Sequence, residues 1–432
     1  MPQVNKLRTA LSGGTGGDTA PPPPTRLRTA LTVFFALDGF LFAGWVVRIP
    51  AIKHQTGATP STLGLALLGV SAGAVITMML TGRLCRRHGS HAVTVVCGVL
   101  LSLSIALPAQ TGSALSLGLV LLLFGAAYGG MNVAMNSAAV DLVAAMRRPV
   151  MPSFHAAFSL GGMAGAGLGG LVAGSLSPAA HLFALTGVGL LVTAVTGPVL
   201  LRGGTAAAPP AGQRVADAAE KRAADAKDER AADAPGQRGV DAPARPGRMS
   251  AHARRIVALF GVIALCTAYG EGALAEWGAL HLSQDLGAGP GPAAAGYSVF
   301  ALTMAIGRLT GTTLLERFGQ TRTLVAGGAT AAAGMLLGAL APTLWLALAG
   351  FAVAGLGLAN IFPVAVGRAG ALAGPSGVAA ASTLGYGGML LGPPVIGFLA
   401  DWFSLPVALV TVTLLAATAA VLGYAARNAA NT

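Results

Sequence analysis

The sequence predicts an all-α, polytopic membrane protein with twelve transmembrane helices arranged as two six-helix bundles. Three observations support this prediction. Twelve stretches are apolar on every face and about as long as the 20 residues that a helix needs to cross a bilayer. The 432 residues are 54% apolar and only 10% charged. A charged interruption near residues 203–252 separates six stretches from six. Because the stretches lack the alternation of barrel strands, their backbone groups must be satisfied within helices.

The twelve expected spans fall into two domains with short ends and one linker between them. In the N-terminal bundle, residues 28–202, they are 28–47, 61–82, 91–108, 113–136, 153–175 and 180–201. In the C-terminal bundle, residues 253–426, they are 255–281, 292–314, 321–341, 343–366, 376–400 and 403–425. Residues 1–27 and 427–432 are expected to be cytosolic tails. The first tail has a proline run but no apolar core, so we expect no cleaved signal peptide.

The linker, residues 203–252, contains four octapeptide units that each begin with arginine: RVADAAEK, RAADAKDE, RAADAPGQ and RGVDAPAR. Prolines stop any long helix there, and the segment has almost nothing apolar to bury, which favours disorder. A contact with anionic lipid or with a partner is the alternative, but the interspersed aspartates favour a solvated linker.

The distribution of positive charge predicts the topology. The net charge is +12, yet the basic residues lie in short loops, in the linker and in the tails rather than along one exposed face, so nucleic acid is not an expected partner. If both termini and the linker are cytosolic, the outer loops keep only Arg48 and Lys53. This asymmetry is typical of a multi-pass membrane protein that keeps its positive charge in the cytosol. The three cysteines fit neither a metal site nor a disulfide set.

Two pairs of similar segments indicate an internal repeat. DGFLFAGW, which begins at Asp38, is echoed by EGALAEW, which begins at Glu271. GRLCRRHG, which ends at Gly89, is echoed by TTLLERFG, which ends at Gly319. Parallel six-helix repeats place a substrate cavity at the interface of the two halves, near the bilayer midplane.

Ionisable residues inside the expected spans are the first functional candidates, because an unpaired charge in a bilayer is costly. Asp38 is the leading proton-site candidate; a fixed salt bridge or a neutral core acid is the alternative. Glu271 and Glu276 are further proton-coupling candidates, but they point about 140° apart on a helix. We therefore expect Glu271 to face the cavity and Glu276 to brace a neighbouring helix or an outer gate. Arg308 is available to Glu271 or to an anionic substrate.

Other polar and aromatic residues are weaker candidates for the cavity wall. Tyr128, Asn132 and Asn136 form one stripe at four-residue spacing, which favours either helix–helix hydrogen bonds or substrate contact. The remaining candidates each have a structural alternative, namely interfacial anchoring, a fixed hydrogen bond or simple packing. They are Trp45, Trp277, His155 and Tyr386.

The segment from Gly82 to Gly89 resembles the signature between the second and third spans of the major facilitator superfamily, which contains a glycine, a leucine, an acid, an arginine and a second glycine. Arg86 stands at the acid position, so the resemblance implies a weakened gating ion pair in the first half, whereas the second half keeps an acid and a base. A basic loop that serves only topology is the alternative. The gating-loop candidates are Gly82, Arg83, Arg86, Arg87, Gly89, Glu316, Arg317 and Gly319.

A closer resemblance, to a bacterial branch of that superfamily near the fucose-permease-like carriers, extends over nearly the whole membrane region and implies a place in the bacterial cytoplasmic membrane. It rests on RIPAIK from Arg48, GGMNVAMN to Asn136, FHAAFSLGG from Phe154, EGALAEWGALHL from Glu271, GLGLANIFP to Pro363 and GYGGMLLGPP from Gly385. Two departures are Glu276, where relatives tend to carry aspartate, and Thr312, where an acid often follows the arginine by one turn.

The function that we expect is proton-linked secondary transport of a small solute by alternating access, without enzymatic activity, cofactor or metal. GAGLGG from Gly165 lies in a spanning helix with no preceding strand, and neither a phosphate-binding loop nor HExxH occurs. Symport and efflux antiport both remain open, and a polytopic sensor that does not transport is the alternative of another class. We expect a protein that works as a monomer in the lipid bilayer, with protons and a small molecule as partners.

Overall fold

The computed structural model describes residues 24–146, 150–204 and 251–428, and every regular element in these ranges is a helix. The all-α prediction is therefore confirmed. The first bundle contains α2 (Pro24–Val46), α3 (Ile49–Thr56), α4 (Pro60–His88), α5 (Ser90–Ser104), the short η1 (Pro108–Gln110), α6 (Ala114–Met146), α7 (Met151–Val172) and α8 (Pro178–Gly204). The second contains α10 (Ala251–Gln284), α11 (Pro290–Leu340), α12 (Leu344–Leu358), α13 (Ile361–Trp402), α14 (Leu405–Ala425) and η2 (Ala426–Asn428).

The helix boundaries differ from the expected spans in ways that have simple causes. α2 begins at Pro24, inside the expected tail, because a helix continues past the apolar run into the polar residues that flank the bilayer. The expected span 343–366 is interrupted: α12 ends at Leu358 and α13 begins at Ile361. Pro363 has no backbone N–H to offer the preceding turn, which favours a break at this place. The expected disordered linker lies, apart from its first and last residues, outside the described residues.

Gly89 and Gly319 end their helices with the same backbone geometry. Gly89 follows α4 with φ 83° and ψ 142°, and Gly319 interrupts α11 with φ 76° and ψ 166°. Residues with a side chain rarely adopt positive φ, so glycine is needed at both positions. α11 thus consists of two helical arms that meet at Gly319, as α4 and α5 meet at Gly89. This agreement supports the internal repeat seen in the sequence.

α13 also combines two arms. A Cβ atom on Gly377 would clash with the carbonyl oxygen of Ala369, eight residues earlier, which a straight helix would hold about 12 Å away. The chain therefore reverses between these residues. α12 and the first arm of α13 together form one candidate membrane span, Leu344–Ala373, and the second arm forms the next, Ala380–Trp402.

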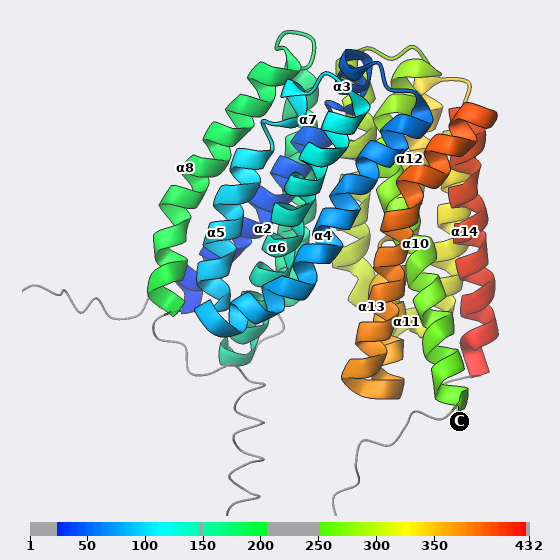
Figure 1. The fold of residues 1–432 in the computed structure, drawn as a ribbon. Helices are drawn as coiled ribbons and strands as arrows, with labels where there is room; N and C mark the ends of the chain where they lie inside the picture. Colours follow the sequence, from blue (N-terminus) through cyan, green and yellow to red (C-terminus); the bar gives the residue numbers. More distant parts are fainter. Residues whose placement is uncertain (1–23, 147–149, 205–250, 429–432) are drawn as a thin grey trace, which may run out of the picture.

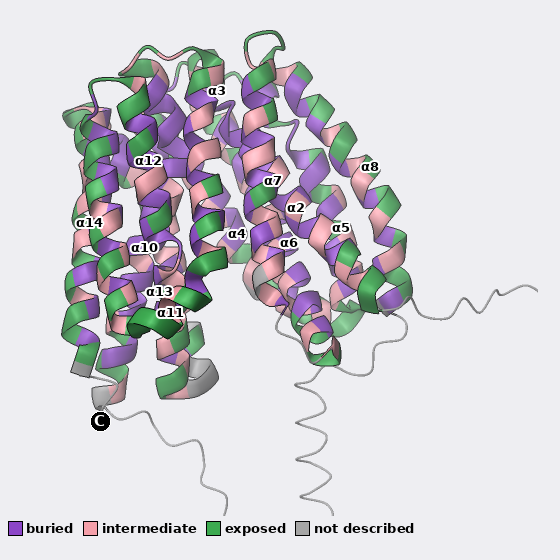
Figure 2. Ribbon diagram, turned by 180° about the vertical axis from the view of Figure 1, so that it is seen from behind, coloured by how far each residue is buried: buried purple, intermediate pink, exposed green. Residues whose placement is uncertain are grey.

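Ten segments of the described ranges are long and apolar enough to cross a membrane. This set omits α7 and counts the 51-residue α11 once, although Gly319 divides it. The exact number of twelve crossings stays a prediction. Figure 2 shows exposed residues along the outer faces of the helices and buried residues between them. Many of the exposed residues are large and apolar, such as Leu115 and Leu171, as expected for a surface in contact with lipid.

Small residues allow the helices of each half to approach closely. Gly125 of α6 faces the backbone of Val70 in α4, and Gly161 of α7 faces the backbone of Ala36 in α2, so that a Cβ at either glycine would clash. Because lipid is as apolar as a leucine side chain, membrane helices associate mainly through such close contacts. The glycines thereby fix the positions of α2, α4, α6 and α7 around the centre of the first bundle.

The two halves meet mainly through two pairs of helices, with smaller contacts of α10 with α2 and α3. α7 packs against α11, and α4 packs against α13. In Figure 1 the start of α2 and the end of α14 lie at one end of the molecule, which we call the terminus end. The opposite end carries α3 and is called the α3 end. The contacts between the halves determine at which end the space between them is closed.

Candidate functional site

A pocket lies between the two halves, in the middle of the helices. Seven of the long helices contribute to its wall, so it belongs to neither half alone. From the first half it is lined by Phe42, Val70, Ser71, Ala74, Val75, Met78, Tyr128 and Phe158. From the second half it is lined by Glu271, Gly272, Ala275, Glu276, Tyr297, Phe300, Tyr386 and Met389.

Glu271 and Glu276 both line this pocket, which corrects the expectation that only Glu271 would do so. The wall that α10 contributes also includes Gly272 and Ala275, so a broad arc of the helix faces the pocket. A Cβ on Gly272 would meet no atom within 4 Å, which leaves room for the pocket to curve around the helix between the two acids. The 140° between the two positions is therefore spanned by one pocket.

Glu271 forms an ion pair with Arg308 of α11, with 3.2 Å between Nη2 of the arginine and Oε2 of the glutamate. The side chains of Glu271 and Arg308 are 28% and 25% exposed, so the pair is only partly shielded from water. Nη1 of Arg308 also donates a hydrogen bond to Oγ of Ser159 in α7, at 3.4 Å. Arg308 therefore joins an acid of its own half to a hydroxyl of the other half.

Glu276 has no such partner. It is 8% exposed, and its Oε2 atom is buried without a hydrogen bond among the described residues. Burying a charge without a partner costs free energy. The cost is relieved when the group takes up a proton or binds a ligand of opposite charge. Glu276 is thus the acid of the pocket that is available for a new interaction.

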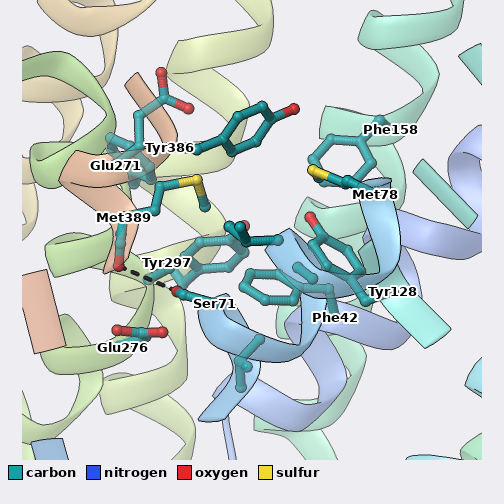
Figure 3. A pocket seen from close by; sticks show the side chains of 16 residues that line it. Phe42, Ser71, Met78, Tyr128, Phe158, Glu271, Glu276, Tyr297, Tyr386 and Met389 are labelled. Atoms are coloured by element: carbon teal, nitrogen blue, oxygen red, sulfur yellow. Dashed lines mark hydrogen bonds between the residues drawn. The ribbon is translucent and has the colours of Figure 1, made fainter. Parts of the chain in front are cut away.

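Aromatic rings form much of the remaining wall. The ring of Tyr128 stacks on that of Phe42 at 5.0 Å between centroids and on that of Phe124 at 6.4 Å. Figure 3 shows Phe42, Tyr128 and Phe158 across the pocket from the two glutamates, with Tyr297 and Tyr386 between them. Ser71 is engaged already, because its hydroxyl donates to the carbonyl of Met389 at 3.1 Å.

Asp38 does not line the pocket. It is fully buried inside the first half, and neither carboxyl oxygen has a hydrogen-bond partner among the described residues. Its neighbour Gly39 touches the backbone of Phe158, a pocket residue, so Asp38 lies behind the wall rather than on it. The described residues offer Asp38 no salt bridge, and its role as a proton site stays a prediction.

The two tryptophans that were candidates for the cavity wall lie in the cores of their bundles. Trp45 is 1% exposed and lies against Phe124, and Trp277 is fully buried with its indole nitrogen unpaired among the described residues. Neither lines the pocket, and neither reaches a surface where an interfacial anchor would lie. Tyr128 and Tyr386, in contrast, are part of the pocket wall as expected.

Asn132, Asn136 and His155 also lie off the pocket wall. The amide of Asn136 donates to the backbone carbonyl of Asn132 at 2.8 Å, one turn away on α6. The ring of His155 meets that of Phe35 edge-on, with 5.6 Å between centroids. The first contact lies within α6 and the second joins two rings, so neither is the alternative that the sequence left open, which was a helix–helix hydrogen bond for the asparagines and a fixed hydrogen bond for His155.

The segment expected to be a gating loop is helical up to His88. Gly82, Arg83, Arg86 and Arg87 belong to the last turns of α4, and the three arginines are exposed. Glu316 and Arg317 are exposed in the corresponding turns of α11 before Gly319. The described residues show no ion pair at Glu316.

Two hydrogen bonds near these positions were not expected from the sequence. Ser90 donates to the carboxylate of Asp141 in α6 at 3.5 Å, and Arg368 of α13 donates to the side chain of Gln320 at 3.1 Å. Each bond connects the residue directly after a positive-φ glycine to another helix of the same half.

The halves are held together at the α3 end. Oδ2 of Asp401, on α13, accepts a hydrogen bond of 2.9 Å from the backbone N–H of Ser61 at the start of α4. Burial lowers the pKa of Lys53 in α3, and the negative charge of the same aspartate offsets part of that shift. Gly64 of α4 contacts the backbone of Pro393 in α13. A carboxylate at the N-terminus of a helix from the other half is a favourable electrostatic contact.

Further cross-half contacts lie between α7 and α11. Gly170 contacts Ala294 and Gly291, and the hydroxyl of Ser298 donates to the carbonyl of Met163 at 3.5 Å. Along α7 these contacts lie between Ser159 and the α3 end. The cross-half hydrogen bonds of the described residues thus all occur from the level of Arg308 to the α3 end.

Sequence reasoning missed several pocket residues, among them Tyr297, Phe42 and Met78. Tyr297 lies near the start of an apolar stretch where a tyrosine is not unusual, and a phenylalanine or methionine in a membrane helix carries no functional signal of its own. Only the packing of the two halves shows which of these residues face the pocket. Among the described residues no group of three or more histidines, cysteines or acids is placed to hold a metal ion.

Comparisons with known proteins agree with this architecture. The chain matches the family model of the Major Facilitator Superfamily over residues 29–269 and 257–431. It is 30% identical to an uncharacterised MFS-type transporter of Yersinia pestis, with 91% of this chain and 94% of the relative covered. It is 33% identical to an uncharacterised transporter of Sinorhizobium fredii, with 90% and 95% covered.

A solved structure with the same fold is that of a bacterial homologue of the human lysosomal transporter Spinster in an inward-facing and unoccupied conformation. The TM-score is 0.70, the sequence identity is 14%, and 94% of this chain and 97% of that chain are covered. None of these descriptions mentions the fucose-permease-like carriers, so the narrower resemblance stays a prediction.

Proposed function

Because the chain belongs to the major facilitator superfamily, we propose that it is a secondary active transporter that moves a small solute in exchange for, or together with, protons. Membership of this family of multi-pass transporters supports transport across a membrane. The coupling to protons, the alternating access and the orientation with both termini in the cytosol are parts of the proposal. The observation that carries it is the pocket shared by the two halves, with the Glu271–Arg308 pair beside it.

The contacts between the halves support alternating access at this pocket. The halves touch from the level of Arg308 to the α3 end, so this end is closed in the present state. If the terminus end faces the cytosol, the pocket is reached from the cytosolic side. In the opposite state the contacts of Asp401 with Ser61 and of Gly64 with Pro393 separate, and the halves approach each other at the terminus end.

The ion pair offers a physical link between proton binding and this movement. A proton on Glu271 removes the charge that attracts Arg308, since a neutral carboxyl holds an arginine far more weakly than a carboxylate does. Arg308 is then free to leave its position, and its contact with Ser159 of the other half is lost. Protonation of a residue in one half thereby weakens the connection between the halves.

Transport by purified protein tests the proposal. A thermal-shift screen of metabolites and drugs first identifies a ligand, and proteoliposomes are then used to measure counterflow of that ligand and its accumulation under a pH gradient. For Glu271→Gln we expect counterflow to persist and gradient-driven accumulation to be lost. Glu220→Gln, which removes a glutamate outside the described residues, is the control and should behave like the original chain.

Two outcomes would contradict the proposal at different points. Unchanged gradient-driven accumulation in Glu271→Gln would exclude the assigned role of the ion pair. A ligand that binds tightly but is never exchanged across the membrane would exclude a carrier and favour the polytopic sensor. Accumulation inside or outside the vesicle, for a known orientation of the protein, distinguishes symport from efflux antiport.

A further inference from the structure

The charged residues that line the pocket are both acids. Glu271 and Glu276 contribute carboxyl groups, whereas no lysine, arginine or histidine side chain is part of the wall formed by the described residues. Arg308, which is not part of the pocket wall, offsets the charge of Glu271. The charge of Glu276 has no counterpart, since one of its oxygens is buried and unpartnered. An anionic solute would be repelled here, and a cation would supply the missing partner.

The rest of the wall suits an apolar and polarisable solute rather than a polyhydroxylated one. Six of the sixteen lining residues are aromatic, and two are methionines. The faces of tyrosine and phenylalanine rings attract a cation, more strongly where water is excluded. A sugar would need several hydrogen-bonding side chains, but the hydroxyl of Ser71 is already used by Met389. Apart from Ser71 and the paired Glu271, the polar groups of the wall are three tyrosine hydroxyls, each on an aromatic ring, and Glu276.

The two kinds of side chain lie on different sides of the pocket. Figure 3 shows Glu271 and Glu276 on one side, with Tyr128 and Phe42 on the opposite side. A solute that spans this space therefore meets an acid at one end and aromatic rings at the other. This arrangement matches a molecule with a positively charged nitrogen and an apolar body, because pockets recognise ligands through a few placed polar groups in an apolar wall.

Resting on the transport function proposed above, we infer that the substrate class is organic cations, bound through the carboxylate of Glu276 and the aromatic rings of the pocket. Glu276 is the anchor for the positive charge, and Tyr297 and Tyr128 provide ring faces for the cation or its apolar body. Glu271 keeps its pair with Arg308 while the ligand is bound. The two acids of α10 thus have separate tasks, one in holding the substrate and one in the connection between the halves.

Radiolabelled benzyltrimethylammonium is a suitable probe, because its charge does not depend on pH and its ring resembles the apolar end that the pocket accepts. Binding to purified protein is measured with 3-phenylpropionate, an anion of similar size, as the comparison ligand. We expect saturable binding of the cation and none of the anion. Glu276→Gln should weaken binding about tenfold or more, which corresponds to about 1.4 kcal/mol. Glu220→Gln serves as the matched control.

The role of the aromatic rings is tested with two variants of Tyr297. Tyr297→Phe keeps the ring face and should bind the cation within about twofold of the original chain, whereas Tyr297→Leu should weaken binding about fivefold to tenfold. Equal losses in both variants would show that the hydroxyl matters and would overturn the role of the ring. Thermal unfolding of each variant shows whether it is folded, so that a loss of binding is attributed to the pocket.

The outcomes separate this inference from the proposed function. Stronger binding of 3-phenylpropionate than of the cation, no saturable binding of the cation, or cation binding that Glu276→Gln leaves unchanged would each overturn the substrate class. Exchange of a neutral or anionic solute in proteoliposomes would then still support a transporter. Cation binding that requires Glu276 but is accompanied by no counterflow would uphold the site and contradict transport.

Discussion

The two halves of the molecule place similar acids in different surroundings. Asp38 begins the repeated segment of the first half, and Glu271 begins that of the second. Asp38 is buried behind the pocket with both oxygens unpartnered, whereas Glu271 lies on the pocket wall with Arg308 at 3.2 Å. The difference shows that a repeat in sequence fixes the position of an acid along a helix but not its role. The role is determined by which side chains of neighbouring helices surround it.

The end of the same segment shows a second difference. The residue before the tryptophan is Gly44 in the first half and Glu276 in the second. A Cβ on Gly44 would clash with the side chain of Leu185 in α8, whereas Glu276 faces the pocket. The first half therefore uses this position for close packing, and the second uses it for an acid. Both acids of the pocket thus come from the second half, and the first half contributes most of its side chains as apolar and aromatic wall.

Breaking the Glu271–Arg308 ion pair of the second half should have the largest effect on stability. Arg308→Leu leaves Glu271 without its partner, and removal of one member of a buried pair costs about 3 to 5 kcal/mol. Because the pair is about one-quarter exposed, we expect a loss nearer about 2 kcal/mol in the free energy of unfolding in detergent. The double variant Glu271→Gln/Arg308→Gln should recover part of this loss. Arg322→Leu, at an exposed position of α11, is the control, and an equal loss there would contradict the account.

Disrupting the contacts that close the α3 end should have the next largest effect. Gly64→Ala places a methyl group against the backbone of Pro393, and overpacking of this kind costs about 1 to 3 kcal/mol. The clash exists only while the α3 end is closed, so the variant should favour the other state and lengthen distances across this end. Gly187→Ala, where a Cβ meets nothing within 4 Å, is the matched control. If the distances between spin labels across the α3 end are unchanged in Gly64→Ala, the contact of Gly64 with Pro393 does not keep this end closed.

The unpaired acid of the first half should give an effect of the opposite sign. Asp38→Leu removes a buried polar group that has no partner, so the free energy of unfolding should rise by about 1 to 2 kcal/mol. If Asp38 takes part in proton coupling from behind the pocket, the stabilised variant should also lose gradient-driven transport. Denaturant unfolding in detergent measures the first effect. A clear destabilisation would mean that the carboxyl group has a partner in the folded protein.

The smallest expected effects are two equal ones. Gly89→Ala and Gly319→Ala each place a side chain at positive φ, which costs about 1 kcal/mol. Because the backbone geometry at the two positions is nearly the same, the two losses should agree within about 0.5 kcal/mol. A much larger loss at one position would indicate that the two halves of the repeat differ in how strongly this turn is fixed. Thermal unfolding of both variants under one condition makes the comparison.

The sequence predicts the fold well because apolar length and charge asymmetry report directly on the bilayer. It also gives Glu271, Tyr128 and Tyr386 as candidates for the cavity, since each is a polar residue inside a span, but the same reasoning applies to Asp38, Asn132 and Asn136, which do not line the pocket. It does not predict that Trp45 and Trp277 are buried in the bundle cores. A tryptophan in a membrane helix is equally compatible with the cavity wall, the bundle core and the membrane–water interface. Glu276 can line the pocket because Gly272, one turn earlier on α10, has no side chain to fill the space between the two acids. A helical wheel shows the direction of each side chain but not the space that a glycine leaves open.

The most direct test follows the two ends of the molecule at once. One pair of spin labels is placed at the exposed His54 and Gln284 of the α3 end, and another at the exposed Ala145 and Ala371 of the terminus end, in a chain without its three native cysteines. On lowering the pH from 8 to 5, the account predicts a longer α3-end distance and a shorter terminus-end distance, and no response in Glu271→Gln. Distances that stay fixed at both ends, or a pH response that survives in Glu271→Gln, would contradict it.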